Sequence, residues 1–155
     1  MIRTNRRMGL CTAAIVLILA FIWGNSLMSA EVSHALSEWV KGLLKPFLTE
    51  TAAVIQEENP LLRKLAHFTE FAALGFCLTW RRGMLGKSLH GALLSGFGAA
   101  ALDETIQLFV PDRGPGIADV LLDSTGVLAG MLLCCLGHTL LKAKKSTNHL
   151  LEDTK

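Results

Sequence analysis

The residues best suited to do chemistry lie in the stretch 103–113, Asp-Glu-Thr-Ile-Gln-Leu-Phe-Val-Pro-Asp-Arg, at the end of a long apolar run. Asp103 and Glu104 are adjacent carboxylates, Gln107 is an amide one helical turn later, and Arg113 is a cation. If this run crosses a membrane, an acidic pair inside it is costly unless other groups stabilise the charge. The sequence therefore predicts partners for these acids elsewhere in the chain.

Two other apolar segments carry the expected partners. They contribute five further ionisable residues, namely Lys64, His67, Glu70, Asp119 and Asp123. At about 100° per residue, the polar residues of each segment fall on one face of a helix, within an arc of roughly 120° or less. The face that carries the two later aspartates continues into Gly126 and Gly130, a GxxxG spacing that lets a neighbouring helix approach closely. We therefore expect these acids to face the interior of a bundle.

Up to five carboxylates would meet one lysine, one histidine and one arginine in this cluster. In a low dielectric they must be paired, protonated or neutralised by a bound cation. One interpretation is a structural ion-pair network, and a second is an outward-open polar pocket for a charged headgroup or another envelope ligand. A third is a catalytic site with His67, Glu70 or Glu104 as acid or base and a divalent cation as cofactor. Proton or ion transport is a fourth, although no inverted repeat supports it.

Composition favours an integral membrane protein. The chain has 155 residues, of which 51% are hydrophobic and 18% charged, and its mean hydropathy is +0.43. The net charge of +2 and the lack of a basic stripe with interleaved aromatics argue against nucleic acid as a partner. All four cysteines lie inside apolar runs without a CxxC spacing, so we interpret them as small buried hydrophobic residues.

The predicted architecture is all-α, an integral membrane bundle of four transmembrane helices in a single domain, 1–155. The expected spans are about 9–29, 61–80, 88–110 and 117–141, each close to the length that crosses a bilayer. Between the first two spans, residues 31–60 alternate apolar and charged positions at helical spacing, which predicts an external amphipathic helix that either lies at the membrane surface or packs on the other spans. Residues 146–155 are expected to form a polar tail. Cleavage of the first span as a signal peptide is the alternative to an anchor, because Met28-Ser29-Ala30 resembles a cleavage site.

Loop charges predict the orientation. Basic clusters precede the first span, join the second to the third and follow the fourth, whereas acidic residues gather in the other loops. The positive-inside rule then places both termini in the cytoplasm, as a multi-pass protein of the cell membrane. With this topology, polar groups from all four spans, including Asn25 and Ser26 of the first, lie in the outer half of the membrane.

These residues resemble a known family, the VanZ-like membrane proteins. Three motifs carry the resemblance: Lys64-x-x-His67-Phe68-x-Glu70-Phe71-x-x-Leu74-Gly75, Asp103-Glu104-x-x-Gln107-x-Phe109-x-Pro111-x-Arg113, and Asp119-x-x-x-Asp123-x-x-Gly126-x-x-x-Gly130. The chain departs from the family pattern at Phe71, where an aromatic hydroxyl is usual, and at Asp123, where Asn is frequent. The founding member is associated with bacterial resistance to the glycopeptide teicoplanin. The resemblance implies a bacterial envelope role for an inner-membrane protein and supplies no reaction.

The sequence therefore favours a VanZ-like envelope protein whose outward-facing acidic pocket binds a lipid headgroup or a lipid-linked envelope component. The alternative is a membrane-embedded enzyme, a hydrolase or transferase acting on an envelope lipid through Glu70, His67 and the Asp103–Glu104 pair. The full set of expected binding residues is Lys64, His67, Glu70, Asp103, Glu104, Gln107, Arg113, Asp119 and Asp123. Oligomeric state and metal identity are not encoded in any motif.

Overall fold

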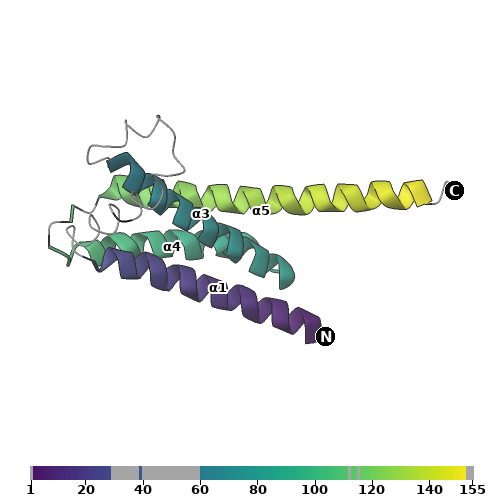
Figure 1. The fold of residues 1–155 in the computed structure, drawn as a ribbon, viewed down its shortest axis with the longest axis horizontal. Coiled ribbons are helices and arrows are strands. Elements are labelled where there is room, and N and C mark those ends of the chain that lie inside the picture. Colours follow the sequence, from purple (N-terminus) through teal and green to yellow (C-terminus); the bar gives the residue numbers. More distant parts are fainter. Residues whose placement is uncertain (1, 29–38, 40–59, 112, 115, 153–155) are drawn as a thin grey trace.

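The chain folds into a small bundle of helices. The computed structural model describes residues 2–28, 39, 60–111, 113, 114 and 116–152. Over these ranges there is no strand, and the main elements are four helices, which Figure 1 labels: α1 (Ile2–Ser26), α3 (Pro60–Met84), α4 (His90–Gln107) and α5 (Ile117–Glu152). The predicted all-α class is confirmed. Apart from residues 39 and 60, the external amphipathic helix expected at 31–60 falls on residues outside this description.

The helix ends differ from the predicted spans in ways that local chemistry explains. The first helix begins at Ile2 and so includes the basic residues that precede the apolar run. The third predicted span ends early, at Gln107, and a turn leads from it to Pro111, which cannot continue a helix. The last helix continues to Glu152, beyond the predicted end at 141 and through part of the expected tail, because Lys and Ala there favour helix and no Pro or Gly interrupts it.

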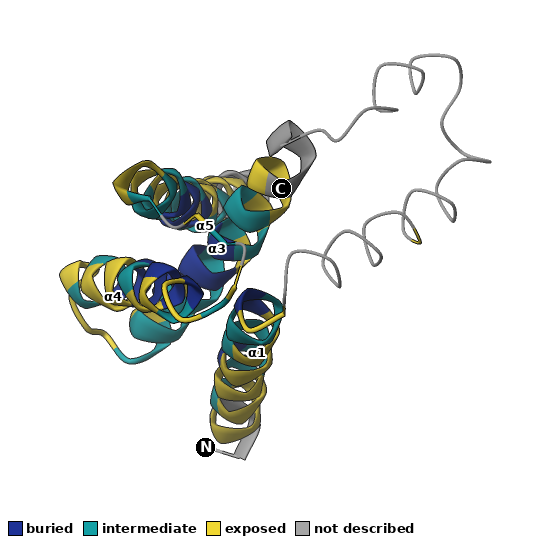
Figure 2. Cartoon of the chain, turned by 90° about the vertical axis from the view of Figure 1, so that its left-hand side faces the viewer, coloured by how far each residue is buried: buried dark blue, intermediate teal, exposed yellow. Residues whose placement is uncertain are grey.

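Helix α3 occupies the centre of the bundle. It packs against α1, α4 and, along the longest interface, α5, while α4 also contacts α1 and α5 (Figures 1 and 2). The core between the helices is small and consists of Ile15, Ile22, Phe71, Leu74, Ala99, Ala100 and Val127. The large residues among them come from α1, α3 and α5, whereas α4 contributes alanines and so lies close to its neighbours.

Glycines on α5 bring this helix unusually close to α3. A Cβ atom on Gly130 would overlap the carbonyl oxygen of Ala72, and one on Gly126 would lie 2.6 Å from the carbonyl oxygen of Phe68. Gly75 of α3 is equally restricted, because its Cβ would overlap the backbone of Val127. The GxxxG spacing therefore does what the sequence predicts, and it brings the polar residues of α3 and α5 to one another.

Replacing Gly130 with alanine is expected to lower the free energy of unfolding by about 1–3 kcal/mol, because the backbone of Ala72 must move to admit the methyl group. Gly137→Ala is the matched control, since a Cβ at Gly137, on the same helix, meets nothing within 4 Å. Unfolding of both variants in detergent micelles by titration with SDS measures the difference. Equal stability of the two variants would contradict the close approach of α3 and α5 at Gly130.

The outward faces of the helices are apolar. Exposed large hydrophobic residues include Leu17 and Phe21 on α1, Leu94 on α4, and Leu132 and Leu133 on α5. Figure 2 shows exposed residues along the sides of α1, α4 and α5 that face away from the bundle. Two segments, Asn5–Ser26 and Ile117–Lys144, are long and apolar enough to cross a membrane. In the most apolar part of each segment, only 11% and 22% of the residues, respectively, are buried inside the bundle. The core helix of a soluble protein would be mostly buried. Together these faces are typical of a membrane protein.

Helices α3 and α4 do not meet the same criterion of length and composition, so four membrane spans are not established by it. Their polar residues lower the mean hydropathy, but several of these side chains are buried between the helices, Thr79 of α3 among them. Asp103, Glu104 and Gln107 of α4 are all buried. Mean hydropathy counts these residues as if they faced lipid, whereas in this bundle they face the other helices.

Candidate functional site

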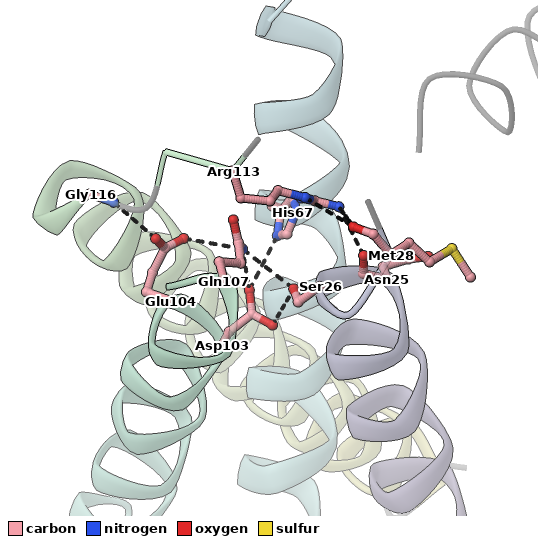
Figure 3. A network of polar contacts seen from close by, with 9 residues as sticks. All are labelled: Asn25, Ser26, Met28, His67, Asp103, Glu104, Gln107, Arg113 and Gly116. Carbon is pink, nitrogen blue, oxygen red and sulfur yellow. Dashed lines mark hydrogen bonds and ion pairs between the residues drawn. The ribbon is translucent and has the colours of Figure 1, made fainter. Parts of the chain in front are cut away.

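A network of polar side chains closes one end of the bundle, with Asp103 of α4 at its centre (Figure 3). Its carboxylate is completely buried. Ser26 Oγ, at the end of α1, donates a hydrogen bond of 2.6 Å to Asp103 Oδ1, and Gln107 Nε2 donates one of 3.0 Å to Oδ2. Because a buried carboxylate without donors is costly, these two bonds fix both the position of Asp103 and the contact between α1 and α4.

Glu104 ties the segment after α4 back onto that helix. The backbone N–H of Gly116 donates to Glu104 Oε2 at 3.0 Å, and Gln107 Nε2 lies 3.4 Å from Oε1. Gly116 immediately precedes α5, so this carboxylate also places the first turn of that helix. Glu104, one of the three candidate acid–base residues, therefore has a positioning role.

Arg113 holds the end of α1. Its Nη2 atom donates to the carbonyl oxygens of Asn25 at 2.9 Å and Met28 at 3.0 Å, and its Nε donates to the latter at 3.2 Å (Figure 3). The last carbonyl groups of a helix have no partner within the helix, and a cation there is favourable. The sequence predicts Arg113 as a partner of the acids, and the structure adds this capping of α1.

Lys64 and Asp119 form the outer edge of the site. Lys64 Nζ lies 3.4 Å from Asp119 Oδ1, and 53% and 32% of their side chains are exposed. The pair joins α3 to α5 near the surface, where a salt bridge contributes about 0–1 kcal/mol.

Three helices place one metal-ligating side chain each at the centre of the network. We call His67 of α3, Asp103 of α4 and Asp123 of α5 the inner cluster. One potential ligand atom from each residue lies within 4.8 Å of the others, and His67 Nδ1 is 3.9 Å from Asp103 Oδ2. Asp123 is 1% exposed, and neither of its carboxylate oxygens has a hydrogen-bond partner. One oxygen of Glu70, Oε2, is also buried without a partner.

An apolar cavity of about 230 Å³ lies between α1, α3 and α4. It is lined by Leu19, Trp23, Leu74, Leu78, Ser95, Gly98, Ala99 and Leu102. These residues sit within a few turns of the network, since Trp23 precedes Ser26 by three residues and Leu102 is next to Asp103. A second, more open cavity lies along the first half of α1 and reaches Arg81. Neither of these two cavities is lined by a residue of the polar network, which is itself largely buried.

The structure brings together most of the residues that the sequence singles out, and it adds Gly116. Ser26, which the sequence places among the polar groups of the outer half of the membrane, is a donor to Asp103. Gly116 acts through its backbone N–H, so no residue type marks it. All four cysteines are unpaired and partly buried, whereas the sequence predicts small buried hydrophobic residues.

A comparison with known protein families gives one result over most of the chain. The sequence model of the VanZ/LLP1 family matches residues 11–140, a range that contains every residue of the network described above. No curated protein and no solved structure matches the chain. The match covers far more than half of the sequence, and the chain therefore belongs to the VanZ/LLP1 family.

Proposed function

We propose that this member of the VanZ/LLP1 family is a multi-pass membrane protein of the bacterial envelope that binds a lipid or lipid-linked envelope component. The polar network would recognise the headgroup, and the cavity between α1, α3 and α4 would accept part of an acyl or prenyl chain. The proposal includes a link to glycopeptide resistance, which family membership supports.

The position of the apolar cavity within one or two helical turns of the buried polar network, along both α1 and α4, is the observation that carries this proposal. An amphiphile needs polar partners at one end and apolar surface at the other, and α4 offers both within two turns, from Gly98 to Asp103. The cavity, at about 230 Å³, is smaller than the ~300–1,000 Å³ of sites that enclose a whole small molecule. It therefore suits a segment of a chain whose remainder lies in the bilayer.

The orientation of the protein in the membrane is part of the same proposal. The N-terminus, the α3–α4 turn and the C-terminal part of α5 lie toward one end of the bundle, and the network lies at the other (Figure 1). Arg6, Arg7, Arg81, Arg82 and Lys87 mark the first of these ends. The positive-inside rule then supports cytoplasmic termini and an outward-facing network.

Filling the cavity tests the proposal. Gly98→Leu places a side chain in the cavity, and its Cβ meets no atom within 4 Å, so the fold is expected to tolerate it. Lipid that copurifies with the protein, identified and counted by mass spectrometry, should fall by about tenfold or more, equivalent to about 1.4 kcal/mol of affinity. Gly137→Leu on α5, where a Cβ also meets nothing within 4 Å and which does not line the cavity, is the matched control and should retain the lipid.

A cellular assay extends this test to resistance. Expression of the wild-type chain in a teicoplanin-sensitive bacterium should raise the inhibitory concentration of the drug, Gly137→Leu should do the same, and Gly98→Leu should not. If Gly98→Leu is folded and retains the same lipid in the same amount as the wild type, the cavity is not the binding site.

An enzyme acting on the bound lipid is the second candidate. It is favoured by His67, which is 15% exposed and faces the buried Asp103, because a carboxylate can orient an imidazole that serves as general base. Incubation of the purified protein with total bacterial lipid, followed by mass spectrometry, separates the two functions. New lipid products that disappear in His67→Gln would indicate catalysis, and unchanged lipids would indicate binding.

A further inference from the structure

We propose that the inner cluster, His67, Asp103 and Asp123, is a binding site for a divalent metal ion of the first transition series, such as Zn²⁺ or Mn²⁺. The site is formed by one ligand from each of three helices, and the ion would join α3, α4 and α5. The proposal goes beyond lipid binding and does not depend on it, since the ligands all come from the protein.

Asp123 is the residue that points to a ligand. It is 1% exposed, both of its oxygens lack a hydrogen-bond partner, and one of them lies within 4.8 Å of ligand atoms of the other two residues. A buried carboxylate in such a position is normally paired, hydrogen-bonded or coordinated to a metal. The lysine of the predicted site, Lys64, forms a salt bridge with Asp119.

Geometry and charge both fit a divalent ion. Ligand atoms around a tetrahedral ion with bonds of about 2.1 Å lie about 3.4 Å apart, so small side-chain rotations convert the present spacing into coordination. Two carboxylates and a neutral imidazole give a total charge of −2, which an M²⁺ ion cancels. One nitrogen and two oxygen ligands suit Zn²⁺ and Mn²⁺ better than Mg²⁺, because an imidazole is a poor ligand for the harder ion.

The surroundings of Asp103 resemble the outer shell of a metal site. Ser26 donates to its Oδ1 and Gln107 to its Oδ2, at 2.6 Å and 3.0 Å, and such bonds fix the orientation of a ligating carboxylate. Three protein ligands leave a further coordination position open for water or for an oxygen of a bound molecule.

The test uses the full chain without an affinity tag, delipidated, purified in detergent and freed of metal with a chelator. ZnCl₂ and MnCl₂ are the probes, with MgCl₂ for comparison. The number of metal ions bound per protein chain is measured after gel filtration. The affinity of the protein for each ion is measured by calorimetry. We expect one Zn²⁺ or Mn²⁺ per chain, together with a rise in the unfolding temperature. Asp123→Asn and His67→Gln should each weaken binding by at least about tenfold.

Asp119→Asn is the matched control, because it makes the same change one turn away on α5, at a residue outside the inner cluster. It should bind the metal as the wild type does. Thermal unfolding without metal guards against a misfolded variant: Asp123→Asn should then be at least as stable as the wild type, since it removes a buried charge, and only the wild type should gain stability from Zn²⁺ or Mn²⁺. Failure of the wild type to bind either ion stoichiometrically, or equal binding by Asp123→Asn, would overturn the proposal.

Discussion

Replacing Asp103 with alanine is expected to lower the free energy of unfolding by about 3–5 kcal/mol, enough to deplete the folded protein in cells. The change leaves Ser26 Oγ and Gln107 Nε2 without their common acceptor, at about 1–3 kcal/mol for each buried donor, and it also leaves a cavity. The free energy of unfolding in detergent micelles by SDS titration measures the loss, and protein abundance in the membrane gives an independent readout.

Asp119→Ala is the control for this experiment. It removes a carboxylate from the same site, but Asp119 is partly exposed and pairs with an exposed lysine, so the cost should be at most about 1 kcal/mol. A double-mutant cycle sharpens the comparison. Ser26→Ala and Asp103→Ala should be non-additive by about 0.5–3 kcal/mol, since they remove the two ends of one hydrogen bond. Additive effects would mean that this bond does not join α1 to α4.

A loss of stability in Asp103→Ala would show that Asp103 has a structural role. Other carboxylates of the network could still bind a ligand. Asp103 and Glu104 are held by donors from the protein, and their loss should be seen first in stability. Asp123 and Oε2 of Glu70 have no partner within the part of the chain described here. Asp123, with neither oxygen partnered, does not stabilise the fold by hydrogen bonding, so its presence is better explained by a ligand than by packing.

The sequence predicts the helices well because apolar runs bounded by charges define them. It does not predict which helix is central. Helix α3 carries charged residues at both ends and would be taken for a peripheral helix, yet it contacts α1, α4 and α5. Gly75, Gly126 and Gly130 explain this position, since close approach of α3 and α5 depends on what each glycine meets across the interface. That partner is a property of the tertiary structure.

The candidate site divides in the same way. Helical spacing places Asp103, Glu104 and Gln107 on one buried face, and the structure agrees. The pairing of charges could not be predicted, because it depends on how each helix is rotated about its axis and shifted along it relative to its neighbours. In the structure, Lys64 lies beside Asp119 at the surface, and Arg113 donates to the last carbonyl groups of α1. Asp123 lies beside His67 and Asp103, an arrangement that the sequence can only suggest as an excess of negative charge.

Accessibility of engineered cysteines is expected to differ completely between the two ends of α4. In a background without the four native cysteines, Gly114→Cys should react with a membrane-impermeant maleimide added to cells whose outer permeability barrier has been opened. Lys87→Cys should react only after the inner membrane is broken. Both positions are exposed, one between α4 and α5 and the other in the α3–α4 turn. Mass spectrometry of the labelled protein measures the extent of reaction at each position.

The length of α4 makes this a sharp test of the four-span arrangement. Its 18 residues extend about 27 Å, close to the ~30 Å of a hydrocarbon core, so even the shortest helix of the bundle could separate the two aqueous phases. Labelling of both cysteines from the same side would mean that α4 does not cross the membrane, although its apolar residues face outward. Labelling of Lys87→Cys alone from outside would reverse the orientation, and the polar network would then face the cytoplasm. A substrate from the outer envelope would in that case have no access to the inner cluster.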